Sequence, residues 1–281
     1  MKKGLVLEGG AMRGMFTAGV MDVLMEHGIE FDGAVGVSAG AAFGCNYKSR
    51  QSGRVIRYNT RFCADKRYGG VSVLLKTGNI YSTDFAYGEV PLVHDVFDFE
   101  TYENNPMEFY VVCTDICTGK AIYHRYEGKD DHGFDWIRAS ASMPLVSKVV
   151  EIDGLKMLDG GISESIPIRF FQNIGYDKNI VVLTRPKSYR KGKNRLMPLM
   201  KLRYRNFPEL LNTLAERHIV YNNTLDYITS EESKGNLLVI QPENDLPISK
   251  VEKDPEKLRT VYELGRKACL EKLDVIIKFL Q

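Results

Sequence analysis

The sequence predicts an α/β fold of three layers, with helices packed on both faces of a mainly parallel central sheet. Short apolar runs alternate along the chain with segments of helical spacing. The run Ile-Val-Val-Leu at residues 180–183 has no polar interruption, which is typical of parallel strands buried on both faces. Glycine-rich turns follow the first two expected strands, as in strand–turn–helix units. The composition, 44% hydrophobic and 26% charged, is ordinary for a globular protein.

The expected strands and helices follow one another along most of the chain. The strands are short apolar runs, at residues 5–7, 34–37, 109–114, 121–123, 155–158, 180–183 and 237–240. The helices have apolar residues at helical spacing or a suitable composition, at residues 16–27, from about 39 to 47, 134–142, 208–228 and 255–279. Asp254 is the expected N-cap of the last helix.

We expect a catalytic core over residues 1–185 and a C-terminal α/β extension over residues 186–281 that packs on the core. The least regular part, residues 186–208, separates the two. The same part is strongly basic, since the chain from Arg185 to Phe207 holds nine Lys or Arg and no Asp or Glu. One basic segment therefore lies in an otherwise acidic protein.

A serine lies between two glycines after the second strand, in the sequence Gly36-Val37-Ser38-Ala39-Gly40. A G-x-S-x-G turn between a strand and a helix exposes the serine hydroxyl, and Gly36 and Gly40 remove Cβ atoms that would clash there. Ser38 is therefore a candidate nucleophile for acyl transfer. The pentapeptide alone also fits an ordinary turn of small residues.

The first strand is followed by a second glycine-rich turn, which contains Gly9, Gly10, Ala11, Arg13 and Gly14. One interpretation is a dinucleotide site, but alanine replaces the second glycine of G-x-G-x-x-G and no acid ends the second strand. The other is an oxyanion hole, in which backbone N–H groups face the oxygen that becomes negative during ester cleavage. Loops after neighbouring parallel strands meet at one sheet edge, so this turn should face Ser38.

The candidate nucleophile needs a base, and two residues compete for the role. His218 is the only histidine that follows the best acid candidate, as a Ser–Asp–His order requires, but its surroundings predict the middle of a helix. Asp159 ends a short strand, and Gly160 and Gly161 allow a tight turn that aims its carboxylate inward. An Asp-Gly surface hairpin is the alternative for this motif.

Four blocks occur in the order seen in patatin-like phospholipases, and the chain resembles this family from residue 1 to about 185. The blocks are residues 9–14, 36–40, 139–144 (Ala-Ser-Ala-Ser-Met-Pro) and 159–161. The bacterial patatin-like proteins look most similar, because their C-terminal extension also includes a Leu-Thr-Arg-Pro stretch, residues 183–186 here. The resemblance implies a Ser–Asp dyad without histidine, in which Ser38 is the nucleophile and Asp159 the base. It also implies an oxyanion hole at Gly9, Gly10 and Ala11, with Arg13 and Gly14 completing the motif.

The implied activity is hydrolysis of acyl esters, of phospholipids or lysophospholipids, with no metal or organic cofactor. Ala11 departs from the family, since many members have glycine there; its methyl group should narrow the pocket or require a negative φ. Two alternatives remain open. One is a non-catalytic patatin-fold protein that binds lipid or nucleotide, and the other is an ordinary Ser–Asp–His esterase that uses His218.

Composition and spacing also bear on partners and location. No apolar stretch approaches the roughly 20 residues of a membrane span, and Glu8 interrupts the first apolar run too early for a signal peptide. We expect a cytoplasmic protein, and residues 185–207, where basic residues mix with Tyr, Leu and Met, are a candidate for peripheral contact with the inner face of an anionic membrane. The alternative is a solvated segment lying over the core. No nucleic-acid-binding module is recognisable, and the oligomeric state is left open.

The five cysteines predict no metal site. Their number is odd, and no C-x-x-C pair is present. Cys113 and Cys117 lie in or beside an apolar run, so we expect both to be buried free thiols.

Overall fold

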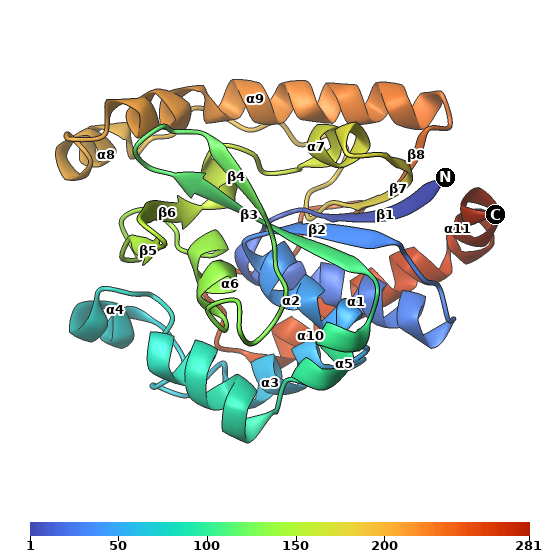
Figure 1. Cartoon of the computed structure of the whole chain (residues 1–281), viewed down its shortest axis with the longest axis horizontal. Coiled ribbons are helices and arrows are strands. Elements are labelled where there is room, and N and C mark those ends of the chain that lie inside the picture. Colours follow the sequence, from blue (N-terminus) through green and yellow to red (C-terminus); the bar gives the residue numbers. More distant parts are fainter.

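The computed structural model describes residues 1–281 and is built around an eight-stranded, mainly parallel sheet (Figure 1). The strands are β1 (Lys2–Leu7), β2 (Gly33–Val37), β3 (Glu108–Asp115), β4 (Ala121–Arg125), β5 (Val150–Ile152), β6 (Leu155–Asp159), β7 (Tyr176–Val182) and β8 (Leu237–Ile240). Their order is β5-β6-β3-β2-β1-β7-β8, with β4 also paired to β3. The strands from β3 to β8 in this order are parallel, whereas β4 and β6 run antiparallel to β3.

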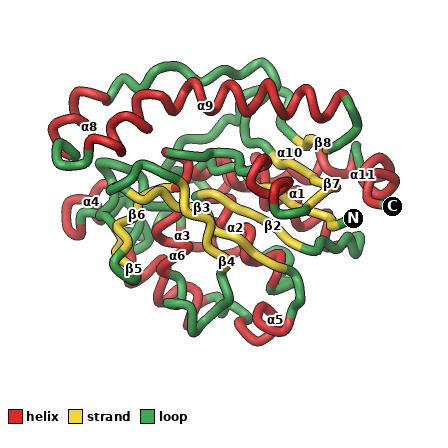
Figure 2. The backbone as a smooth tube through the Cα atoms, turned by 45° about the horizontal axis from the view of Figure 1, so that its top comes forward, coloured by secondary structure: helices red, strands yellow, loops and turns green.

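Helices cover both faces of the sheet, which confirms the three-layer α/β prediction. Figure 1 shows α9 and α7 on one face and α1, α2 and α10 on the other, and Figure 2 shows α9 running the length of the molecule with α8 at its end. The helices are α1 (Gly14–Glu26), α2 (Ala39–Lys48), α3 (Arg54–Phe62), α4 (Val71–Thr77), the π-helix η2 (Phe85–His94), α5 (Phe99–Asn104), α6 (Asp135–Ser140), α7 (Ile168–Asn173), α8 (Met197–Arg203), α9 (Pro208–Ser233), α10 (Pro255–Leu270) and α11 (Leu273–Leu280).

Two apolar cores lie on opposite faces of the sheet because side chains alternate along each strand. Leu5 and Leu7 of β1 belong to the larger core, together with α1, α2 and α10. Val6, between them, belongs to the smaller core under α7 and α9. The larger core also reaches residues 55–137, a region that carries no strand of the sheet before β3.

The structure corrects two sequence predictions about the last helix and the cysteines. The helix predicted over residues 255–279 is two helices, because α10 ends at Leu270 and α11 begins at Leu273; Lys272 between them donates its Nζ to Val239 O of β8 (2.7 Å). Asp254 does cap α10, accepting from Glu256 N (2.9 Å). Cys113 is buried as expected, but Cys117 is exposed because it lies in the turn after β3.

The C-terminal residues share the layers of the rest of the chain. β8 pairs with β7 in parallel, and α10 packs on α1, where Tyr262 OH donates to buried Asp22 (2.7 Å) and Arg266 pairs with Glu26. The boundary at residue 185 stays a prediction. None of the helices combines the length and the apolar character that crossing a bilayer requires.

Candidate active site

The register of β3 brings Ser38 and Asp159 together. One side of β3 pairs with β4 over residues 110–114, so β2 and β6 must share the other side. Val37 at the end of β2 pairs with Val112, and Asp159 at the end of β6 pairs with Cys113, the next residue. Because β6 is antiparallel, the two strand ends meet head-on, and Ser38 Oγ donates to Asp159 Oδ2 at 2.7 Å.

Ser38 lies on a sharp turn between β2 and α2. Its backbone has φ 55° and ψ −120°, a conformation that costs a non-glycine residue energy and is typical of a nucleophile elbow. A Cβ at Gly36 would overlap Gly40 O, and a Cβ at Gly40 would overlap Leu7 O, so both glycines are needed for close backbone packing. Ser38 N donates to Ser140 Oγ (2.8 Å), which links the elbow to the residue 139–144 block.

Asp159 is buried, and both of its carboxylate oxygens have partners. Oδ2 accepts from Ser38 and Oδ1 accepts from Gly161 N, each at 2.7 Å. Burial raises the pKa of Asp159, while the Ser38 hydrogen bond and the charge of Arg217 act in the opposite direction. A Cβ at Gly160 would overlap Val112 O, so this glycine lets the turn after Asp159 pass close to β3.

The first glycine-rich turn lies against the elbow, as predicted for loops after neighbouring parallel strands. A Cβ at Gly9 would lie 3.0 Å from Ser38 Cβ, and the N–H groups of Gly9 and Gly10 donate to no protein atom. Such free amides beside a serine fit an oxyanion hole. Arg13 is the last residue of the short η1 helix (Ala11–Arg13), and α1 begins at the next residue, Gly14. The Nε of Arg13 is buried and has no hydrogen-bond partner.

Ala11 differs from the expectation that its methyl group requires a negative φ. Its φ is +49°, in the left-handed region that favours glycine. The surrounding turn therefore imposes on Ala11 the backbone that a glycine would adopt freely. Ala11 also lines the cavity beside Ser38, so its methyl group lies where it can narrow the pocket.

The structure does not bring a histidine to Ser38 or Asp159. His218 lies on α9, where its Nδ1 contacts Ala215 O (3.0 Å). His124 and His132 instead contact Asp131 and Asp153. No group of three His, Cys, Asp or Glu residues is arranged to hold a metal ion.

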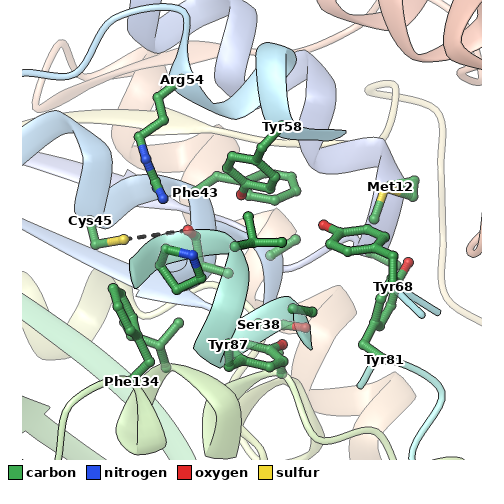
Figure 3. A pocket seen from close by; sticks show the side chains of 18 of the residues that line it. Met12, Ser38, Phe43, Cys45, Arg54, Tyr58, Tyr68, Tyr81, Tyr87 and Phe134 are labelled. Atoms are coloured by element: carbon green, nitrogen blue, oxygen red, sulfur yellow. Dashed lines mark hydrogen bonds between the residues drawn. The ribbon is translucent and has the colours of Figure 1, made fainter. Parts of the chain in front are cut away.

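An apolar cavity of about 90 Å³ opens beside Ser38 (Figure 3). Sixteen of its 19 lining residues are hydrophobic, so it suits a hydrocarbon chain rather than a polar group. Figure 3 shows Tyr58, Tyr68, Tyr81 and Tyr87 around the space next to Ser38. The pKa of Tyr87 is raised to about 12 by burial, so its hydroxyl is neutral at physiological pH.

Most of these aromatic residues come from α3, α4, η2 and their connections, which the sequence predictions missed. The cover segment, residues 54–95, is fixed by Asp95, which accepts two hydrogen bonds from Arg57 (2.6 and 2.8 Å) and lies 3.3 Å from the buried Nε of Arg54. The one available signal was the high density of Tyr and Phe between residues 58 and 87, outside every motif.

The basic segment, residues 185–207, divides into two parts. In the first part, Arg185 and Arg190 pair with Asp245 and Asp226, and Lys191 turns inward. The second part includes α8 and exposes three leucines beside its basic residues: Leu196 (54% exposed), Leu199 (49%) and Leu202 (71%). Figures 1 and 2 place α8 and α4 at the same end of the molecule.

Fold and site together define a class of protein: a three-layer α/β protein in which a serine on a strand–helix elbow contacts a buried carboxylate. Comparison with known families agrees with this class. A model for patatin-like phospholipases matches residues 5–171, and a model described as a domain of unknown function (DUF6363) matches residues 207–281. The first match covers more than half of the chain, so the chain belongs to the patatin-like phospholipase family. The predicted resemblance is confirmed, and the protein is a lipid-ester hydrolase.

Similar proteins occur in bacteria, fungi and animals. The "uncharacterized protein YjjU" of Escherichia coli is 27% identical over 93% of this chain and 74% of its own length. Lysophospholipase nte1 of Aspergillus niger is 29% identical, but the match spans 62% of this chain and only 11% of that protein. The patatin-like phospholipase domain-containing protein ZK370.4 of Caenorhabditis elegans is 30% identical over 61% of this chain and 13% of its own length. The solved structure of VipD from Legionella pneumophila aligns with 98% of this chain and 67% of its own, at 12% identity and a TM-score of 0.48.

Proposed function

We propose that the protein hydrolyses carboxylic esters of phospholipids or lysophospholipids through a Ser38–Asp159 dyad. The observation that carries this proposal is the 2.7 Å hydrogen bond from Ser38 Oγ to the buried carboxylate of Asp159. A hydroxyl within this distance of a carboxylate can lose its proton to it as it attacks a carbonyl. The apolar cavity beside Ser38 supports an acyl-chain substrate, and relatives named lysophospholipases support a phosphate-bearing lipid.

The proposed reaction has two steps with the same proton carrier. In the first, Ser38 Oγ bonds to the ester carbonyl carbon, its proton passes to Asp159, and the alcohol leaves with that proton as the acyl-enzyme forms. In the second, Asp159 takes a proton from water, the hydroxide attacks the acyl-enzyme, and Ser38 recovers its proton as the acid is released. The free amides of Gly9 and Gly10 stabilise the oxyanion in both steps.

The environment of Asp159 supports its role as a base. Burial raises the pKa of its carboxyl, which brings proton affinity closer to that of an effective base at neutral pH. The two hydrogen bonds to its oxygens keep the group oriented toward Ser38. The oxygen that accepts from Ser38 is therefore already aimed at the proton it must remove.

The test is hydrolysis of a p-nitrophenyl ester by Ser38→Ala and Asp159→Asn protein. We expect each variant to lose activity by at least about 10³-fold, because each removes one partner of the proton transfer. Ser52→Ala, at an exposed serine, is the matched control and should keep wild-type activity. Full activity of Asp159→Asn together with loss in His218→Ala would establish an ordinary triad. Failure of a fluorophosphonate to label Ser38 in folded protein would favour a non-catalytic binding protein.

We further propose that the second part of the basic segment, residues 193–205, contacts anionic membranes. Its support is the combination of exposed leucines with Lys201, Arg203 and Arg205, which suits an interface between charged head groups and acyl chains. Reversing these three charges should weaken binding to anionic liposomes. Reversing the exposed Lys257, Arg259 and Lys267 of α10 should not, and equal binding by both triple variants would refute the proposal.

A further inference from the structure

Three basic side chains form a cluster without an acidic hydrogen-bond partner: Arg217 of α9, which donates to Gly161 O next to Asp159, Lys191, and Arg13 of the first glycine-rich turn on the far side of Lys191. Neighbouring Arg185 and Arg190 do form salt bridges, with Asp245 and Asp226. The three lie close enough to one another that the charges of Arg217 and Arg13 both act on Lys191. Arg217 and Lys191 in turn act on Asp159, so the cluster adjoins the candidate base.

The hydrogen-bond donors of the cluster are largely unused. The Arg13 side chain makes no hydrogen bond, and its Nε is buried. Lys191 Nζ has no acceptor and lies over the Tyr221 ring, 4.1 Å from its centroid. Arg217 donates its Nε to Gly161 O (2.5 Å). Its Nη2 also lies beside Gly161, 3.3 Å from where a side-chain Cβ would be, and donates to no protein atom. Each cation therefore keeps donors available for a ligand.

The one other buried carboxylate in this region, Glu8, does not satisfy these donors. Its Oε2 accepts from Thr184 N (2.5 Å) and Thr184 Oγ1 (3.0 Å), and its Oε1 accepts from Tyr221 OH (2.6 Å). All three donors are neutral, and no cation forms an ion pair with Glu8. Glu8 supplies negative charge nearby but leaves the guanidinium and ammonium groups without a direct acceptor.

A cluster of this kind is costly for the free protein. Burying a charged group without a hydrogen-bonded partner is unfavourable, and the cost grows when like charges lie together. Burial and the neighbouring arginines lower the pKa of Lys191 to about 7. Groups with a perturbed pKa cluster at functional sites, and this one lies next to a candidate catalytic residue.

We propose that Arg13, Lys191 and Arg217 form an anion subsite that binds the phosphate of the substrate head group. This inference rests on the proposed function and adds a role for two residues of the C-terminal segment. A phosphate has several acceptor oxygens in different directions, which suits two guanidinium groups and an ammonium group better than a single carboxylate does. The apolar cavity takes the acyl chain, and its lining includes Ser38 but none of the three cations. The ester bond is thereby placed between the two parts of the site.

The first experiment compares two substrates with the same acyl chain, a lysophospholipid and a monoacylglycerol, below their critical micelle concentrations. The measured quantity is the ratio of their kcat/KM values, phosphate-bearing over phosphate-free. We expect Lys191→Met to lower this ratio by about tenfold, mainly through KM, because one charge-assisted hydrogen bond is lost. Lys191→Arg, which keeps the charge, should retain most of the ratio. An unchanged ratio in Lys191→Met overturns the proposal, whether or not both activities fall.

Lys187→Met is the matched control, since Lys187 is an exposed lysine in the same segment and should keep the wild-type ratio. Binding to Ser38→Ala protein, measured by calorimetry, separates this inference from the proposed function. Tighter binding of the lysophospholipid than of the monoacylglycerol, reduced by adding Lys191→Met, supports the subsite even if no ester is hydrolysed. Binding of inorganic phosphate without preference for the lysophospholipid would assign the cluster to free phosphate and overturn the head-group assignment.

Discussion

The two sides of Ser38 differ in how the donors of their inward-facing cations are used. On the side of the apolar cavity, Arg54 is buried but fully paired: it donates to Asp95 O and to Asn46 Oδ1 (2.8 Å), and Asp95 lies within salt-bridge distance. On the side of Asp159, Arg13 and Lys191 have no acceptor at all. Arg54 is buried and Arg13 and Lys191 are half-buried, but the clearer difference is that the donors of Arg54 are used within the protein and those of Arg13 and Lys191 are not.

The largest expected effect is on the free energy of unfolding, and it separates Asp95, the partner of Arg54, from Lys191, which has no acceptor. Asp95→Ala should lower the free energy of unfolding by about 3–5 kcal/mol, because it leaves Arg54 buried without its counter-charge. Lys191→Met should leave the stability unchanged or raise it, because it removes a half-buried charge that lacks a hydrogen-bond acceptor. Urea unfolding measures both.

Asp65→Ala is the control for this comparison. It breaks an ion pair with the exposed Arg67 and should cost no more than about 1 kcal/mol. A large loss of stability in Lys191→Met would show that Lys191, like Arg54, is a structural residue, and would remove the difference between the two sides.

The second prediction concerns the apolar side. Ala42 lines the cavity, and Ala42→Leu places three more carbon atoms in it. We expect the kcat/KM ratio of p-nitrophenyl decanoate over p-nitrophenyl acetate to fall by about 10- to 100-fold, since a long chain loses more room than a short one. Ala215→Leu, at an exposed position of α9, should not alter the ratio. An equal loss for both esters in Ala42→Leu would mean that the cavity does not hold the acyl chain.

The third prediction is that the two sides respond to pH in opposite directions. Asp159 must be deprotonated to act as a base, so kcat/KM for either substrate should fall about tenfold per unit as the pH drops below its raised pKa. Lys191 must be protonated to bind phosphate, so kcat/KM for the lysophospholipid alone should also fall as the pH rises above about 7. The charged and titratable groups around Lys191 are Glu8, Arg13, Asp159, Arg185, Arg217 and Tyr221.

Loss of the alkaline limb in Lys191→Met would assign that limb to this ammonium group. An alkaline limb that also appears with the monoacylglycerol would instead place the titrating group in the catalytic step. The pH profile of kcat/KM for the two substrates thus tests whether Asp159 acts in catalysis and Lys191 in phosphate binding.

Local motifs made Ser38 and Asp159 predictable, because each motif describes its own turn. The sequence also predicted the parallel strands, since their apolar runs have few alternatives. The head-on meeting of β2 and β6 could not be derived, because it depends on which side of β3 is already occupied by β4. The unpaired state of Lys191 was equally hidden: nine basic residues occur together in sequence, and only the fold separates the paired from the unpaired ones.

The smallest expected effect concerns Ala11, which the sequence marked as unusual but whose backbone it did not reveal. A φ of +49° costs an alanine up to about 1–2 kcal/mol relative to its preferred conformations. Ala11→Gly removes this strain but makes the unfolded chain more flexible, so we expect a net stabilisation of at most about 1 kcal/mol. The midpoint temperature of thermal unfolding should then rise by no more than a few degrees. A decrease would mean that the Ala11 methyl group, through its contacts at the cavity wall, contributes more than its backbone costs, and that the turn belongs to the apolar side of the site.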